Sequence, residues 1–254
     1  PGKIGNDQTL CYGGISNALE MIQVPSGGGY GNYIYQWQKS DDGIIWVDIA
    51  GENTTTYSPG SLTQTTSFRL ETSSVFGCGP VATNAVEIEV YEDLTSGEII
   101  GDTICYNTTP GLLEFSNLPT GVDGNYTYQW QESDDLLTWN DIDGATSTTY
   151  QDEALTATKH YRNIISSTFG CNSVTTNVVS VTVYAEFTTG VINESAPICY
   201  NGIPEMISTT TLPTGGDGSY AYQWYLSSDQ TNWSVINGAT SKDYEPSNLT
   251  STTY

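Results

Sequence analysis

An internal repeat of about 94 residues constrains this chain more than any other feature of its sequence. Cysteines recur with that spacing at Cys11, Cys105 and Cys199. The tripeptide Tyr-Gln-Trp recurs with nearly the same spacing and ends at Trp37, Trp130 and Trp224. A period of this length fits one small domain per copy better than one turn of a solenoid. We therefore expect three domains in series, spanning residues 1–94, 95–188 and 189–254, with the third truncated because the chain is an excerpt of a longer one.

Each copy carries the sequence pattern of short β-strands. Alternating runs rich in Val, Ile, Thr and aromatic residues, such as Tyr33–Lys39 and Ser67–Ser73, are separated by Gly, Asn, Asp and Pro. This pattern is typical of strands joined by turns. No segment sustains a helical period of apolar residues. About seven short strands in each copy predict an all-β fold built from tandem immunoglobulin-like β-sandwich domains.

Two tryptophans recur in every copy, and they receive different predictions. Strand alternation puts the tryptophan of Tyr-Gln-Trp on one face with two tyrosines. We predict that this residue lies in the core between the two sheets, at Trp37, Trp130 and Trp224. The second tryptophan alternates with an isoleucine and is expected to lie partly outside the core, at Trp46, Trp139 and Trp233. It could stack on sugar rings or pack across its own hairpin, and its recurrence in every copy favours packing.

The five cysteines indicate disulfide bonds, and their spacing suggests a pairing. Cys11 and Cys78 are 67 residues apart, and Cys105 and Cys171 are 66 apart. This matched spacing predicts one bond inside each copy, Cys11–Cys78 and Cys105–Cys171. Cys199 is then unpaired because the third copy stops before its second cysteine. Disulfides indicate an oxidising compartment, and the lack of a Cys-x-x-Cys pair disfavours metal binding by these residues.

The charge of the chain excludes several classes of function. Asp and Glu number 29 against 6 Lys and Arg, giving a net charge of −23. Nucleic acid is not expected as a partner, because its binding needs a basic surface. No apolar run is long enough to span a membrane. The single histidine, His160, and the lack of any distinctive carboxylate pair predict no catalytic residue and no enzyme.

The many acidic residues make calcium the one cofactor to consider. Asp41 and Asp42 stand in a segment that recurs in each copy, and they favour a capped hairpin turn over a calcium loop. The linker acids Glu92 and Asp93 leave calcium between domains as the weaker alternative. We expect no other cofactor and no other metal site.

A long motif connects these repeats with a known family. Tyr126–Tyr150 carries Tyr-x-Tyr-Gln-Trp-Gln-x-Ser-x-Asp-x-x-x-Trp-x-x-Ile-x-Gly-Ala-Thr-Ser-x-x-Tyr, and Leu155–Arg162 and Gly170-Cys171 continue it. The motif resembles the tandem Ig-like repeats of giant Bacteroidetes cell-surface adhesins, which include gliding-motility adhesins exported by type IX secretion. Asp102-Thr103-Ile104 also resembles the O-glycosylation signal of exported Bacteroidetes proteins, which implies Thr103 as a modified residue.

The resemblance implies a location and a role. The chain would be part of an extracellular stalk on the outer membrane, and its parent protein would contact a substratum or a polysaccharide surface. The secretion and gliding machinery would bind regions outside this chain. The alternative is an array of polysaccharide-binding modules in a secreted protein, with the outward tryptophans stacking on sugars.

Overall fold

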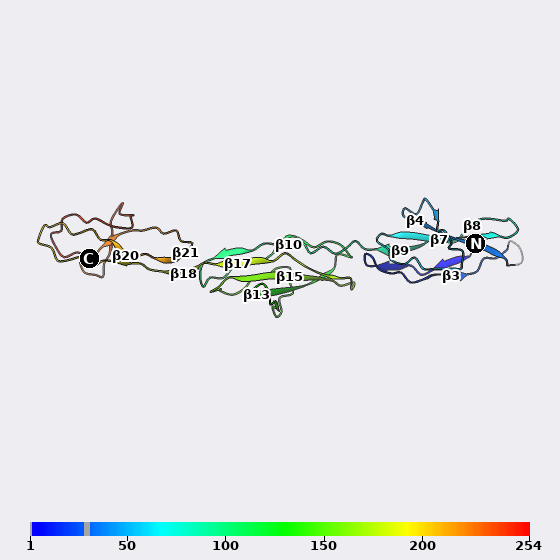
Figure 1. Ribbon diagram of the computed structural model, residues 1–254, viewed down its shortest axis with the longest axis horizontal. Helices are drawn as coiled ribbons and strands as arrows, with labels where there is room; N and C mark the ends of the chain where they lie inside the picture. The colour runs from blue at the N-terminus through cyan, green and yellow to red at the C-terminus, as the bar shows by residue number, and fades with distance from the viewer. Residues whose placement is uncertain (1, 28–30) are drawn as a thin grey trace.

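A computed structural model describes residues 2–27 and 31–254, and these residues form strands, turns and loops without a helix. The predicted all-β class is therefore confirmed. Three units follow one another along one long axis, with the two ends of the chain at opposite ends of the rod (Figure 1). Within the described residues, no helix is long and apolar enough to cross a membrane.

The first repeat is a sandwich of two sheets. The smaller sheet has the order β1-β3-β6 and the larger has the order β2-β9-β7-β4-β5, with β8 also paired to β7. Their bounds are β1 Lys3–Gly5, β2 Gln8–Leu10, β3 Leu19–Gln23, β4 Tyr33–Ser40, β5 Val47–Asp48, β6 Thr56–Tyr57, β7 Thr66–Ser74, β8 Val81–Ala82 and β9 Val86–Val90. The first strand crosses from one sheet to the other, because β1 pairs with β3 while β2 runs parallel to β9. This order is that of an immunoglobulin-like sandwich.

The second repeat uses the same strand order. Its larger sheet is β11-β17-β15-β13-β14 with β16 on β15, and its smaller one pairs β10 with β12. The bounds are β10 Glu98–Ile99, β11 Asp102–Ile104, β12 Phe115–Asn117, β13 Tyr126–Ser133, β14 Asn140–Asp141, β15 Lys159–Ser167, β16 Ser173–Thr175 and β17 Val179–Val183. Equal strand orders in two repeats follow from their shared sequence pattern.

The last part of the chain forms three antiparallel pairs, β18 with β21, β19 with β20 and β22 with β23. Their bounds are β18 Ala185–Thr188, β19 Val191–Ile192, β20 Thr209–Thr211, β21 Thr214–Gly216, β22 Tyr225–Leu226 and β23 Ser234–Val235. Strand β18 lies in the linker after the second repeat and pairs with β21 of the third. It therefore ties the two repeats together through their backbones.

A tryptophan lies at the centre of each of the first two cores. Trp37 and Trp130 are fully buried, whereas Trp224 is half-buried. The indole N–H of Trp37 donates to the Thr54 carbonyl, and that of Trp130 donates to the Ser147 carbonyl. Because the one polar atom of each ring is satisfied, each ring adds a large apolar area to the core without a desolvation penalty.

Candidate functional site at the joint between repeats

The first and second repeats meet at a joint made largely by the backbone. The amide of Thr95 donates to the carbonyl of Thr120 over 2.9 Å, and the amide of Val122 donates to the carbonyl of Glu92 over 3.0 Å. Leu94 between them is only 6% exposed. The linker is thus hydrogen-bonded to the loop that precedes β13 and is not a flexible connection between the domains.

Close approach at this joint depends on a glycine. Gly121 has φ +98°, and a Cβ there would collide with the carbonyl oxygen of Asp93. Gly215 occupies the same place at the second joint, with φ +82°, and its Cβ would collide with the carbonyl of Glu186. Only glycine satisfies both the backbone angle and the contact.

Side chains around the two joints match as well. Tyr126 donates its hydroxyl to the Gly121 carbonyl over 2.6 Å, and Tyr220 does the same to Gly215 over 2.9 Å. Thr95 and Thr120 share a hydroxyl hydrogen bond of 2.8 Å at the first joint. Their counterparts at the second joint, Thr188 and Thr214, share one of 2.6 Å. The chain therefore builds one joint twice, so successive repeats meet in the same way.

A disulfide closes the first joint. Cys11 at the end of β2 bonds to Cys171 in the loop between β15 and β16, with 5.6 Å between their Cα atoms. Beside it, Tyr91 of the first repeat and Phe169 of the second meet edge to face with ring centroids 5.1 Å apart. Cys78, Cys105 and Cys199 carry free, exposed thiols. The predicted bonds Cys11–Cys78 and Cys105–Cys171 are therefore wrong.

Strand direction explains the error. Leu10 lies opposite Val90 in the parallel pair of β2 and β9, which puts Cys11 at the carboxyl end of its repeat. Cys78 follows the far end of β7, whose nine residues span about 26 Å. A disulfide needs Cα atoms within about 7 Å, so the two cysteines of one repeat are too far apart. The spacing misled because Cys171 is the counterpart of Cys78 one repeat further on, so a bond from Cys11 to the next repeat leaves the same periodic spacing of cysteines as a bond within the repeat.

Two of the outward tryptophans, Trp46 and Trp139, are half-buried under arginines. The Arg69 guanidinium lies 4.3 Å from the ring centroid of Trp46, and the Arg162 guanidinium lies 4.2 Å from that of Trp139. Arg69 in turn donates to the side-chain oxygen of Gln38. A cation on the ring face is itself a favourable contact, and it occupies one of the two faces that a sugar could use. Trp233 is 53% exposed.

The recurrent acidic turn caps itself. One oxygen of Asp42 accepts the backbone N–H groups of Ile44 and Ile45, both over 2.8 Å, and the Ser40 hydroxyl. These hydrogen bonds, led by the one from Ile45, lower the pKa of Asp42. Asp135 and Asp229 repeat the arrangement, with lowered pKa values of the same cause. The carboxylates are thus engaged by their own turns, and no group of three or more His, Cys, Asp or Glu among the described residues could hold a metal ion.

Thr103, the predicted glycosylation residue, is exposed on β11 at the edge of its sheet. Sequence reasoning missed the glycines of the joints. Their signal was present as a proline followed two residues later by glycine, at Pro119-Gly121 and Pro213-Gly215. Without the structure, nothing in that pattern separates a joint from an ordinary turn.

Strand order and joints together define a tandem array of immunoglobulin-like domains that is covalently closed between its first two members. A family model described as "Domain of unknown function (DUF8696)" matches residues 1–92, 95–185 and 188–254. The chain belongs to this family and contains three matches to it. A comparison with curated protein sequences gives no match.

Solved structures with a general likeness are also multidomain chains. Three N-terminal domains of the bacteriophage RB49 highly immunogenic outer capsid protein are 17% identical, with a TM-score of 0.41 over 93% of this chain and 78% of that one. Extracellular domains 3–5 of Drosophila OTK are 14% identical, with a TM-score of 0.32 over 94% and 80%. The human desmocollin-1 ectodomain is 11% identical, with a TM-score of 0.43 over 96% and 52%. The assignment of the fold rests on the strand order of this chain and not on these likenesses.

Proposed function

We propose that this chain is a load-bearing segment of the extracellular stalk of a large bacterial cell-surface adhesin. The stalk would serve surface adhesion and gliding motility, reach the outer membrane through type IX secretion, and have domain boundaries at 1–94, 95–188 and 189–254. The resemblance of the repeat motif supports the family of adhesins. The disulfide supports an oxidising, extracellular location. The role is structural, and it requires no catalytic residue, cofactor or nucleic acid.

The observation that carries this proposal is the covalent bond across the joint. Tension applied at the start of the chain passes along β1 and β2 to Cys11, crosses to Cys171, and leaves along β16 and β17. The chain between the two cysteines lies outside this path. A joint that only had to connect two domains would not need such a bond, whereas a joint under tension gains from it.

Stiffness of the joints is the property to measure. A stalk keeps its tip away from the cell only if its domains stay in line, and like charge on every repeat supports an extended array. Small-angle X-ray scattering of the whole chain should therefore give a single rod-like distance distribution. A broad distribution from domains that bend freely at residues 92–95 would contradict the proposal.

Two glycines of one loop provide a matched pair of variants. Gly121→Ala should loosen the first joint in the presence of a reductant, because its Cβ meets the Asp93 carbonyl. Gly124→Ala imposes a similar backbone penalty, since φ is +76° there, but its Cβ meets nothing within 4 Å. Bending in Gly121→Ala and not in Gly124→Ala would support the view that the close contact at Gly121 holds the two repeats in line. Equal scattering from both would show that the contact does not hold the domains in line.

The polysaccharide-binding alternative is tested on the same protein. The arginines over Trp46 and Trp139 weigh against it, because they cover one face of each ring. Titration with soluble polysaccharides should give no binding. Binding that is lost in Trp139→Ala without loss of folding would favour the alternative.

A further inference from the structure

We propose that the joints of this array are closed in series by disulfides of the Cys11–Cys171 type. Cys105 would bond to the hairpin cysteine of the third repeat, and Cys78 would bond to the strand-end cysteine of a repeat joined before Pro1. Each bond thus links neighbouring repeats and none lies within a repeat. This inference concerns the bonding of the repeats and does not depend on the proposed adhesin function.

Cys105 occupies the same structural position as Cys11. It follows β11, which runs parallel to β17, as β2 runs parallel to β9. The Tyr184 amide donates to the carbonyl of Ile104, the residue before Cys105, over 3.0 Å. The Tyr91 amide donates in the same way to the carbonyl of Leu10, the residue before Cys11, also over 3.0 Å. Cys105 is therefore an exposed thiol at the carboxyl end of its repeat, facing the next joint.

The second joint positions the third repeat relative to Cys105. The first joint positions the second repeat relative to Cys11 in the same way. Gly215, Tyr220 and the threonine pair reproduce the contacts of the first joint, as described above. Phe187 in the linker also packs on Tyr220, with ring centroids 5.9 Å apart. Because the docking is the same, the hairpin of the third repeat should reach Cys105. The position equivalent to Cys171 falls beyond Tyr254.

Cys78 has the surroundings of Cys171. In both hairpins the glycine before the cysteine donates its amide to a serine carbonyl, Gly77 to Ser74 over 2.9 Å and Gly170 to Ser167 over 3.2 Å. A phenylalanine amide then donates to the same serine's hydroxyl, Phe76 at 3.2 Å and Phe169 at 3.1 Å. The two hairpin turns therefore have the same hydrogen bonds, and Cys78 is exposed at the amino-terminal end of the first repeat.

Bond formation requires an oxidant of the disulfide class. Two thiols lose two protons and two electrons, and the disulfide of oxidised glutathione accepts both as it becomes two molecules of glutathione. Exchange proceeds through a mixed disulfide, which needs an accessible thiol. The exposure of Cys78 and Cys105 meets that need.

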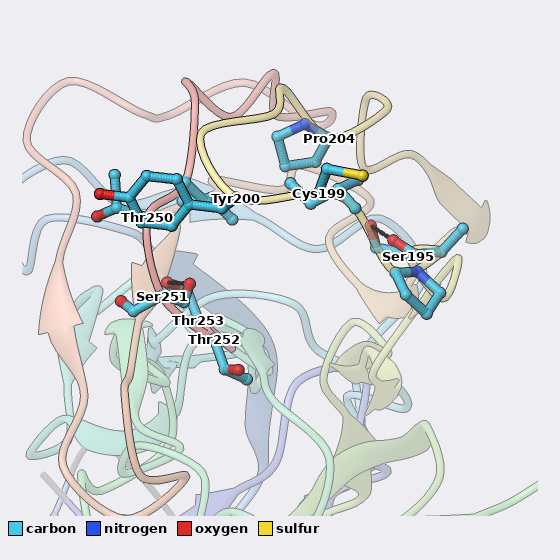
Figure 2. A pocket seen from close by; sticks show the side chains of 12 residues that line it. Ser195, Cys199, Tyr200, Pro204, Thr250, Ser251, Thr252 and Thr253 are labelled. Carbon is cyan, nitrogen blue, oxygen red and sulfur yellow. Dashed lines mark hydrogen bonds between the residues drawn. The ribbon is translucent and has the colours of Figure 1, made fainter.

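The first test completes the third repeat. A groove in that repeat lies between residues 195–200 and 249–253, and Figure 2 shows Cys199 on one side and Thr250 to Thr253 on the other. In the second repeat the corresponding segments contain β11 and lead into β15, and both of these strands pair with β17. The backbone groups of Tyr254 and Ser227 are hydrogen-bonded to each other. This pairing matches that of His160 opposite Ser133 in the second repeat. Residues 161–188 copied after Tyr254 should therefore supply the missing pairing strand together with a hairpin cysteine.

The extended chain is folded with oxidised glutathione, alkylated and mapped by mass spectrometry without reduction. We expect a peptide that joins Cys105 to the added cysteine, with Cys78 and Cys199 alkylated. Cys199→Ser should leave that bond intact, whereas Cys105→Ser should leave the added cysteine alkylated. A bond between Cys199 and the added cysteine, or no new bond beside an intact Cys11–Cys171, would overturn the proposal.

The second test uses a complete domain at the other end. Residues 1–95 copied before Pro1 place a strand-end cysteine next to the first repeat. We expect it to bond to Cys78, so that alkylation of Cys78 falls from nearly complete to nearly absent. A bond between the two cysteines of the copied repeat would instead show pairing within a repeat and would overturn the proposal.

Discussion

Removing the Cys11–Cys171 bond should greatly lengthen the chain when it is pulled from its ends. The bond connects residues 160 positions apart. A fully extended chain spans about 3.3–3.6 Å per residue, so the loop withholds roughly 520–570 Å of length after the 5.6 Å across the bond is allowed for. The whole chain of 254 residues would extend to roughly 830–910 Å. The bond therefore hides more than half of the extensible length.

Single-molecule force spectroscopy with handles at both ends measures this length directly. Total extension after complete unfolding is recorded in oxidising buffer, in reductant, and for Cys171→Ser. The last two should agree with each other and exceed the first by the amount given above. Cys78→Ser is the matched control, because it alters the same hairpin position of the first repeat but should change nothing.

The same experiment separates the two possible pairings. Bonds within each repeat would enclose 67 and 66 residues and hide roughly 430–470 Å after the same allowance for each bond, and Cys78→Ser would release about half of that. Equal lengths in oxidised and reduced chains, or a gain of length in Cys78→Ser, would refute the load path through the joint.

Two further predictions concern the folded repeats. Asn163 is fully buried with both side-chain polar atoms unpaired, and Leu70 takes its place opposite the core tryptophan of the first repeat. Asn163→Leu should therefore raise the free energy of unfolding of the second repeat by about 1–3 kcal/mol in urea titrations, and a loss of stability would contradict this. Asp135 has a pKa lowered by backbone hydrogen bonds from Thr138 and Leu137. Its stabilising effect is present at neutral pH and is lost as pH falls through the lowered pKa, so Asp135→Ala should lower the Tm at pH 7, and the difference from the unmodified chain should shrink as the pH is lowered below 3.8; a difference that does not change with pH would refute it.

Local sequence was sufficient for the two long strands of the first repeat and for the core tryptophans Trp37 and Trp130, though not for Trp224, which is half-buried. The run predicted as Tyr33–Lys39 forms β4, Tyr33–Ser40, and the run predicted as Ser67–Ser73 forms β7, Thr66–Ser74. Both succeed because alternation of apolar and polar residues reflects the two faces of a strand. Arg69 and Arg162 follow an aromatic residue at matching positions of the two repeats, and each lies over a tryptophan ring.

The bonding of the joint could not be predicted in the same way. In a periodic chain, the distance from Cys11 to Cys78 is nearly the distance from Cys105 to Cys171, whichever partner each cysteine takes. Spacing is a one-dimensional quantity, whereas the choice of partner depends on which end of a sandwich each cysteine occupies. That end is set by the parallel pairing of β2 with β9, a contact between segments about 80 residues apart. Only the three-dimensional structure contains it.

Pairing between neighbours has a mechanical consequence that pairing within repeats lacks. With bonds inside each repeat, the chain from Cys78 to Cys105 would stay extensible in every repeat, which is 27 residues per repeat. With bonds of the Cys11–Cys171 type at each joint, tension that arrives at Cys171 would pass along the 28 residues to Cys199. It would then cross the bond formed by Cys199 and bypass the bond formed by Cys105. Those 28 residues then serve two repeats, so the extensible share of the array is halved. Successive bonds also enclose overlapping loops, since residues 105–171 would lie inside two of them, and loss of one bond leaves the other to limit the extension of that segment. An array that must transmit tension while staying short under load is better served by this overlap than by the same number of bonds placed one to a repeat.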